Sequence, residues 1–255
     1  MAITIKSDRD IEKMQKAGHV VSLCHQRIEA AVVPGVTTGE LDAIVVDTLK
    51  EHNALASFLG YNGFPASICA SVNEEIVHGF PGTRVLNEGD IISVDIGAIV
   101  DGWHGDSAWT YAVGSVPAQA EKLLVDTEHA LHLAIAEAVP GNRLGAIGHA
   151  IEQFAAPRGY GIVRGYGGHG IGRRMHEDPH VPNYGSASYG PVLRKGMTFA
   201  IEPMLNIGTD ETRVLSDDWT VVTADGSLSA HFEYTIAITD GEPLILTPRL
   251  TSVVH

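Results

Sequence analysis

Residues 85–97 have the sequence VLNEGDIISVDIG, and residues 192–203 have the similar sequence VLRKGMTFAIEP. The match places a carboxylate at equivalent positions, because Asp95 recurs 107 residues later as Glu202. Upstream, Val-Pro-Gly at 33–35 recurs at 139–141, an offset of 106 residues. A near-constant offset across helix and strand predicts two similar α+β halves around a pseudo-twofold axis. Since no low-complexity linker separates them, we expect one domain over residues 1–255, with halves at about 10–115 and 116–247.

Hydrophobic spacing predicts the elements of these halves. A first helix begins with a capping box at Ser7 and Asp10 and ends before Pro34. Three more helices are predicted, from Thr37 to about Asn53, from after residue 117 to about Val139, and from about Leu144 to Ala156. Runs with strand character lie at 90–100, 107–113, 197–207, 219–223 and 232–239. The Gly-, Pro- and His-rich stretch 164–190 is predicted to be a long ordered loop, and such loops usually carry function.

The composition excludes several classes of protein. Among 255 residues there are 31 acidic and 17 basic side chains, and this formal net charge of −14 argues against sequence-specific nucleic-acid binding. A hydrophobic content of 44% is enough to bury a core. The two cysteines, Cys24 and Cys69, give no disulfide framework, and Cys24 lies on the apolar stripe of the first helix. With no signal-peptide pattern and no membrane-length apolar run, we expect a cytoplasmic protein without a membrane partner.

The repeated carboxylates indicate a metal site. Asp95 and Glu202 lie in runs that otherwise predict burial, where an unpaired charge is costly. Asp106 and Glu233 begin the next predicted strands, so all four carboxylates could converge in an antiparallel sheet and repel one another strongly. Two divalent cations would cancel that charge, and His169 is the candidate imidazole ligand. This donor set suits Mn, Fe, Co or Zn. A site with two such metals is suited to hydrolysis. The alternative to a metal site is that these residues form separate buried ion pairs.

Six motifs then resemble type I methionine aminopeptidase of the bacterial type: NEEIVHG at 73–79, SVDIG at 93–97, GWHGD at 102–106, GYGGHGIG at 165–172, IEP at 201–203 and EYT at 233–235. The resemblance runs from the first helix to about Thr247. It implies the pita-bread fold, in which two pseudo-symmetric halves of antiparallel sheet and flanking helices surround a dinuclear metal site. It also implies removal of the initiator methionine from nascent proteins, with a preference for a small second residue.

The resemblance assigns roles to single residues. Asp106 and Glu233 would bridge two metals, Asp95 would chelate one, and His169 and Glu202 would bind the other. Glu202 would also move protons from the attacking water. His78 matches a histidine near the substrate amide nitrogen, and His176 matches one that contacts the scissile carbonyl.

The resemblance also implies binding residues. The pocket for the methionine side chain would consist of Phe58, Tyr61, Phe64, Cys69, Met175 and Trp219, although core packing would also explain Phe58 and Cys69. Three of these depart from a common bacterial pattern, since Phe58 stands where Cys is frequent, Phe64 where Tyr is frequent and Met175 where Phe is frequent. Asn73 and Ser229 match positions that help to bind a monovalent cation. The expected partners are nascent polypeptide N-termini and, transiently, the ribosome, and the expected state is a monomer.

Other interpretations remain open at this point. Gly165–Gly170 fits G-x-G-x-x-G, but no amphipathic helix follows, so the dinucleotide interpretation lacks its context. His104-Gly105-Asp106, completed by His169 or His231, resembles the triad of a non-haem iron oxygenase, which would leave three carboxylates unexplained. Prolidases and proline-specific aminopeptidases share the ligand set but usually carry a large extra N-terminal domain. A non-catalytic pita-bread binding protein would be expected to have lost some of the five ligands.

Overall fold

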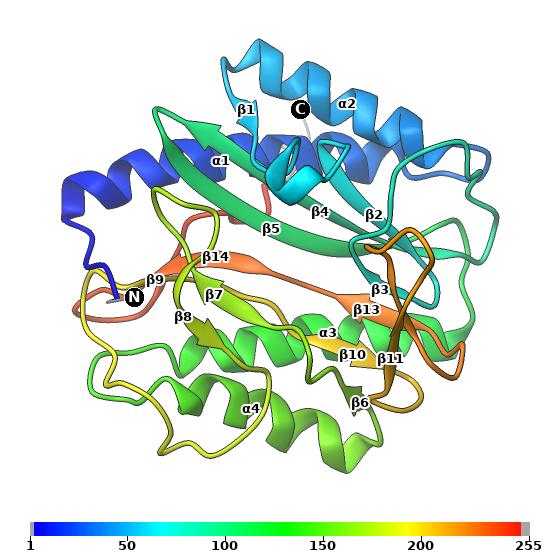
Figure 1. Ribbon diagram of the computed structural model, residues 1–255. Coiled ribbons are helices and arrows are strands. Elements are labelled where there is room, and N and C mark those ends of the chain that lie inside the picture. Colours follow the sequence, from blue (N-terminus) through cyan, green and yellow to red (C-terminus); the bar gives the residue numbers. More distant parts are fainter. Residues whose placement is uncertain (1–2, 251–255) are drawn as a thin grey trace.

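Helices form the two outer layers of the molecule, and antiparallel strands lie between them, as Figure 1 shows. The computed structural model describes residues 3–250. One helical layer consists of α1 (Asp8–Ala31) and α2 (Thr38–Glu51). The other consists of α3 (Ala118–Ala136) and α4 (Gly145–Ala155). All four predicted helices are therefore confirmed, with ends that differ from the predictions by a few residues.

Local sequence explains how the first two helices begin. Ser7 and Asp10 form the predicted capping box of α1, and Thr37 and Glu40 form an equivalent box at α2. The inward face of α1 is apolar, and Cys24 is completely buried on it. This confirms that Cys24 acts as a small core hydrophobe.

The strands form two larger and two smaller antiparallel sheets. In the first sheet, β4 (Ile91–Val100) pairs with β5 (Trp103–Ala112), β1 (Leu55–Ala56) and β2 (Ile68–Val72). The second has the order β15 (Leu244–Ile245), β14 (Tyr234–Ala237), β9 (Thr198–Ile201), β7 (Gly168–Gly170) and β8 (Glu177–Val181). The smaller sheets are β13 (Ser229–His231), β10 (Met204–Asn206) and β6 (Gly161–Ile162), and β11 (Thr212–Val214), β12 (Val221–Thr223) and β3 (Glu75–Val77).

Several strand predictions were wrong in detail. The stretch 164–190 is not only a loop, because it contains β7 and β8. The predicted strand at 197–207 is two strands, β9 and β10, separated by Glu202 and Pro203, since proline cannot donate a ladder hydrogen bond. Asp106 does not begin a strand, because β5 already starts at Trp103. The prediction also omitted seven strands of two to five residues, which are too short for a clear alternation: β1, β2, β3, β6, β11, β13 and β15.

The repeat in the sequence corresponds to a repeat in the structure. An isolated β-bridge joins Thr37 to Val85, and an equivalent bridge joins Arg143 to Val192, 106 and 107 residues further on. Gly35 and Gly141 occupy the same turn, each with φ near +95°, a conformation that favours glycine. Each helix pair is thus tied in the same way to the segment leading into its strand. The pseudo-symmetric fold class is confirmed.

Hydrogen bonds join the two halves where β5 meets residues 231–235. The Ser107 hydroxyl donates to the Glu233 carbonyl at 2.6 Å, and the Glu233 amide donates to the Ala108 carbonyl at 2.7 Å. The Thr235 hydroxyl donates to the Asp106 carbonyl at 2.8 Å. These bonds fix Asp106 of the first half beside Glu233 of the second.

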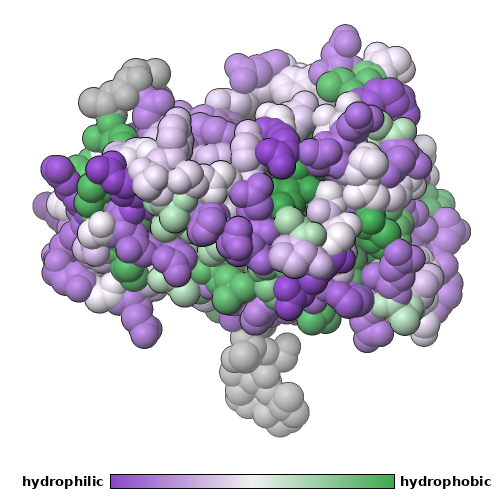
Figure 2. Space-filling view, turned by 90° about the horizontal axis from the view of Figure 1, so that it is seen from below, coloured by the Kyte–Doolittle hydropathy of each residue, from purple (hydrophilic) through white to green (hydrophobic). Residues whose placement is uncertain are grey.

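One face of the molecule is mainly hydrophilic. The face in Figure 2 shows hydrophilic residues over most of its area, with smaller hydrophobic areas among them. Among residues 3–250, no helix combines the length and apolar character needed to cross a membrane.

Candidate active site

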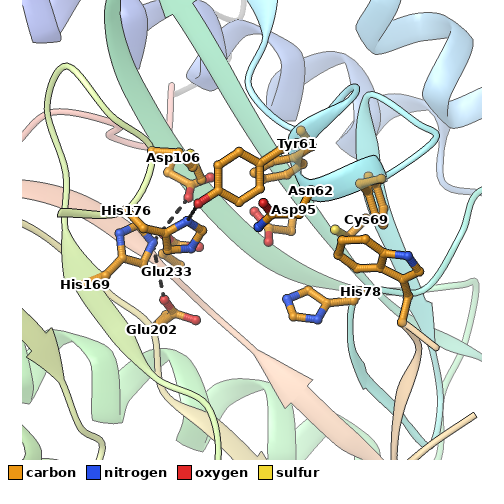
Figure 3. A pocket seen from close by; sticks show the side chains of 14 residues that line it. Tyr61, Asn62, Cys69, His78, Asp95, Asp106, His169, His176, Glu202 and Glu233 are labelled. Carbon is orange, nitrogen blue, oxygen red and sulfur yellow. Dashed lines mark hydrogen bonds and ion pairs between the residues drawn. The ribbon is translucent and has the colours of Figure 1, made fainter.

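A cavity of about 360 Å³ lies between the two halves and brings together every predicted metal ligand, both predicted catalytic histidines and the predicted side-chain pocket (Figure 3). Asn62 is the one lining residue that the sequence did not suggest. The lining residues are Phe58, Tyr61, Asn62, Phe64, Cys69, His78, Asp95, Asp106, His169, Met175, His176, Glu202, Trp219 and Glu233.

The sheet geometry explains why the carboxylates meet. In the ladder between β4 and β5, Asp95 lies opposite Ala108, and Asp106 lies two residues before Ala108 on the same face. The small side chain of Ala108 leaves space, and its carbonyl also holds Glu233 in place. Glu202 reaches the same space from the break between β9 and β10.

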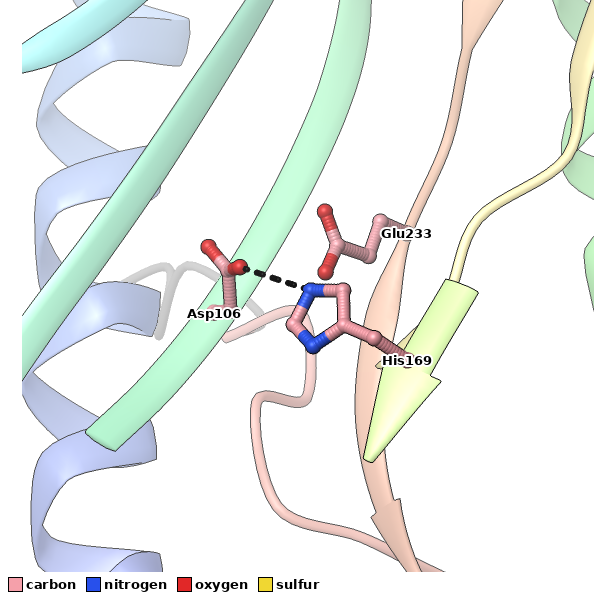
Figure 4. Close-up of side chains that lie close together, drawn as sticks. All are labelled: Asp106, His169 and Glu233. Carbon is pink, nitrogen blue, oxygen red and sulfur yellow. Dashed lines mark ion pairs between the residues drawn. The ribbon is translucent and has the colours of Figure 1, made fainter. Parts of the chain in front are cut away.

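His169 is oriented as a ligand. Its Nδ1 lies 2.9 Å from the Gly170 carbonyl, which can only accept a hydrogen bond, so Nδ1 carries the proton. The unprotonated Nε2 then faces Asp106 Oδ2 and Glu202 Oε1, each at 3.8 Å. One ligand atom each from Asp106, His169 and Glu233 lies within 4.8 Å of the others (Figure 4). Orientation of a ligand histidine by a backbone carbonyl is common in metal sites.

The electrostatics of this cluster are unfavourable without cations. Burial raises the pKa of Asp95 to about 7. Burial, followed by repulsion from neighbouring carboxylates, raises the pKa of Asp106 and of Glu233 well above their usual values. The pKa of Glu202 is also raised, by burial and then by the charge of Asp95.

The same cluster contains buried polar atoms that have no hydrogen-bond partner in the described part of the chain. Asp95 Oδ1, Asp106 Oδ1 and Glu233 Oε1 are buried and accept no hydrogen bond from residues 3–250. Buried polar groups in proteins are normally satisfied. Unpaired carboxylate oxygens beside an oriented imidazole therefore fit divalent cations.

A further histidine, His231, lies in the cluster, although the sequence suggested it only as a member of the oxygenase triad. His231 is 2% exposed, and its Nε2 lies 3.6 Å from Glu202 Oε2 and 3.9 Å from Glu233 Oε2. Burial lowers its pKa to about 3, so it is neutral at pH 7. Its place two residues before Glu233 was the available signal, but the two residues lie on either side of a break between β13 and β14.

The other end of the cavity is apolar. Phe58, Phe64, Cys69 and Met175 form a separate buried cluster, with Trp219 packed against it. The Phe64 ring lies 5.2 Å from the ring of Trp219 and 5.2 Å from that of Phe80, centroid to centroid. Phe80, which the sequence did not suggest, therefore supports the pocket from behind.

The two remaining histidines lie beside the carboxylates. His78 has a left-handed backbone with φ of +63°, and its ring contacts Tyr166 and Trp219 edge-on. Burial lowers the pKa of His78 to about 4. The His176 ring lies 4.2 Å from that of His169, centroid to centroid.

The residues expected at a monovalent cation site also lie together. The Ser229 amide donates to the Asn73 carbonyl at 3.0 Å. The Ser229 hydroxyl is buried and has no hydrogen-bond partner in the described part of the chain. Asn206 pairs with Ser229 between β10 and β13, and its Oδ1 is likewise buried without a partner among the described residues.

Two alternatives are excluded by this geometry. The G-x-G-x-x-G stretch enters β7 instead of a helix, so the dinucleotide interpretation fails. His104 does not line the cavity with the carboxylates, and its Nδ1 is bonded to the Ser57 hydroxyl at 2.9 Å. The oxygenase triad is therefore not formed in a chain whose fold also has four helices.

Comparison with known proteins shows the family to which the chain belongs. Residues 12–240 match metallopeptidase family M24. The chain is 53% identical over 246 residues to methionine aminopeptidase of Clostridium acetobutylicum, covering 96% of this chain and 98% of that protein. It is 51% identical over 245 residues to methionine aminopeptidase 1 of Bacillus subtilis, covering 96% and 99%. The crystal structure of methionine aminopeptidase from Thermotoga maritima superposes with a TM-score of 0.95 at 45% identity, covering 96% of this chain and 99% of that one.

Fold and site together define a metallopeptidase with the pita-bread fold. Within metallopeptidase family M24, the chain belongs to the bacterial-type methionine aminopeptidases.

Proposed function

We propose that this protein is a metal-dependent aminopeptidase that removes the N-terminal methionine from nascent polypeptides. The observation that carries the proposal is one cavity in which a carboxylate cluster adjoins an apolar pocket. An unbranched thioether side chain packs favourably against aromatic rings such as Phe64 and Trp219.

Two divalent cations are proposed at the carboxylate cluster. Asp106 and Glu233 would be shared between them, Asp95 would hold one, and His169 and Glu202 would hold the other. Three unsatisfied carboxylate oxygens and the oriented imidazole support this assignment. Co, Mn, Fe and Zn all suit these donors. Such ions, when bound, activate water and stabilise negative charge on oxygen.

The protein's own side chains would divide the remaining work. Glu202 would accept a proton from the attacking water and return it to the leaving amine, since its carboxylate lies at the cavity wall. His176 would donate a hydrogen bond to the scissile carbonyl oxygen, and His78 would lie near the scissile nitrogen. The apolar pocket would exclude water from around the methionine side chain.

A preference for a small second residue is part of the proposal. A further cavity of about 210 Å³ adjoins the first and shares His78, His176 and Glu202 with it. Tyr166 and His180 also line this second cavity and restrict it. A large second side chain would have to displace one of these rings.

The wider setting is also proposed. A single catalytic domain over residues 1–255 is supported by the main hydrophobic core, which contains residues from both halves. Residues 1–2 and 251–255 lie outside the described part of the chain. We propose a cytoplasmic monomer that meets its substrates transiently at the ribosome, with a monovalent cation near Asn73 and Ser229 as a structural ion.

The test combines metal analysis with a substrate comparison. Gently purified protein should contain up to two equivalents of divalent metal and should release methionine from Met-Ala-Ser. It should leave an Xaa-Pro peptide intact. Cleavage of the Xaa-Pro peptide alone would indicate a prolidase, and cleavage of neither peptide with added metals would indicate a binding protein.

A further inference from the structure

A hydrogen bond joins two residues that line the cavity, between the Tyr61 hydroxyl and Nδ1 of His176, at 2.7 Å (Figure 3). The sequence placed Tyr61 in the methionine pocket. In the structure its side chain stays outside the buried cluster of Phe58, Phe64, Cys69 and Met175, and it is 37% exposed at the rim. Its contact with His176 is therefore its main interaction within the cavity, and the inference below rests on the function proposed above.

Tyr61 is presented by a turn that holds its own shape. The Tyr61 amide donates to the Phe58 carbonyl at 2.9 Å, and the Phe64 amide donates to the Tyr61 carbonyl at 2.9 Å. Phe58 and Phe64, on either side, insert into the apolar cluster. The backbone of Tyr61 is thus held in place by the turn, and its hydroxyl is bonded to His176.

His176 is equally restrained from the other half of the molecule. Met175, immediately before it, is 3% exposed within the apolar cluster. Glu177, immediately after it, is held by Lys6 Nζ at 2.7 Å. The ring of His176 packs against the ring of His169. The residues on either side of His176 are therefore held in place, as are those on either side of Tyr61.

The chemistry of the two groups decides which one donates. A neutral imidazole has one N–H and one acceptor nitrogen. The phenol hydroxyl is the more acidic donor, and an imidazole nitrogen is a better acceptor than a phenol oxygen. The favoured arrangement is donation from Tyr61 to Nδ1, which leaves the single imidazole proton on Nε2.

We propose that Tyr61 is a positioning residue that fixes His176 in the Nε2–H tautomer. In that tautomer His176 can donate to the carbonyl oxygen of the scissile bond. In the other tautomer Nε2 would be an acceptor and would repel that oxygen. Tyr61 thus acts through His176 and need not touch the substrate's reacting atoms.

Kinetics of Tyr61→Phe test the proposal, because this change keeps the ring and removes only the hydroxyl. We expect kcat for Met-Ala-Ser to fall about tenfold with little change in KM. In a His176→Gln background the same change should have almost no further effect. The control is Tyr189→Phe, which removes a hydroxyl from a tyrosine that is 64% exposed and outside the cavity. An unchanged kcat, or an equal fall in the His176→Gln background, would overturn the proposal.

A spectroscopic measurement reads the tautomer without turnover. In ¹⁵N-histidine protein loaded with diamagnetic Zn²⁺, the His176 resonances, assigned by their loss in His176→Gln, should show an unprotonated Nδ1 and a protonated Nε2. Tyr61→Phe should show a mixture of the two tautomers. A protonated Nδ1 in the unaltered protein would refute the inference. If the protein failed to cleave Met-Ala-Ser, the proposed function would fail while this tautomer result remained interpretable.

Discussion

The two ends of the cavity differ in how they are stabilised. At the apolar end, Phe58, Phe64, Cys69 and Met175 bury hydrocarbon and sulfur against one another, which favours folding as in any core. At the other end lie four carboxylates, and burial raises the pKa of each of them. Repulsion from neighbouring carboxylates raises the pKa of Asp106, Glu202 and Glu233 further. The first end stabilises the folded chain by itself. The second is unfavourable for the chain alone and becomes favourable only when cations are bound.

The difference predicts opposite consequences of mutation. Substitutions at the carboxylate end should cost activity and spare the fold. Those at the apolar end should alter substrate binding and cost stability. The two ends can therefore be separated by measuring turnover, KM and unfolding on the same variants.

Glu202→Gln should have the largest effect. The amide keeps the size of the side chain but cannot accept the proton of the attacking water, so kcat should fall by roughly 100- to 10,000-fold. The thermal midpoint should change little. Peptide hydrolysis at saturating metal measures the first quantity and thermal unfolding the second. The matched control is Glu12→Gln on the exposed face of α1, and turnover of Glu202→Gln close to that of this control would exclude the proposed proton transfer.

At both ends the sequence predicted most of the residues and missed one. Asp95 and Glu202 were found by the repeat, because a fold repeated at a fixed offset brings equivalent strand positions to the same axis. His231 and Phe80 carry no such signal. Phe80 lies outside any strand, and the contact of its ring with Phe64 brings it to the pocket. His231 lies two residues before Glu233, but this spacing does not show that its ring also lies beside Glu202. Periodicity reports which face of an element is buried, and it does not report which neighbour lies across that face.

Strand boundaries failed for a related reason. The break between β9 and β10 at Glu202-Pro203 was included in one predicted strand, since the surrounding residues are mostly apolar. That break is what frees the Glu202 side chain to reach the cluster. The hydrogen bond between Tyr61 and His176 could likewise not be predicted from the sequence. The residue types near a rim position and near a pocket position are the same, so the sequence does not distinguish the two.

Phe58→Cys should have an intermediate effect, confined to the apolar end. Phe58 is 7% exposed, and its ring lies 6.4 Å from that of Phe64, so the smaller side chain enlarges the pocket. KM for a methionyl peptide should rise several-fold while kcat changes less, because the lost contacts are made equally before and during reaction. Discrimination against bulkier N-terminal side chains should relax. A fall in kcat with unchanged KM would mean that Phe58 orients the reacting groups instead of forming the pocket wall.

The smallest expected effect concerns how the folding stability of the metal-free protein changes with pH. The pKa of Glu233 is raised in the folded state, so the folded protein holds protons that the unfolded chain releases. This contribution to stability is present in full below the pKa that Glu233 has in the unfolded chain. It is lost as the pH rises through the higher pKa that Glu233 has in the folded protein. Asp95, with a pKa of about 7, places its part of the loss between about pH 4 and pH 7.

Glu233→Gln removes one of the interacting charges and isolates this effect from other titrations. In the presence of a chelator, the variant should match the unaltered protein near pH 5 and exceed it near pH 8, by about 1–3 kcal/mol or roughly 3–10 °C in Tm. Adding Mn²⁺ should reverse the order, because the variant has lost a ligand and gains less from the metal. Glu242→Gln, at an exposed position, serves as the control and should follow the unaltered protein at both pH values. A metal-free variant that is less stable at pH 8 would show that Glu233 contributes more to folding through its hydrogen bonds and packing than it costs through repulsion, and the contrast between the two ends would then not hold.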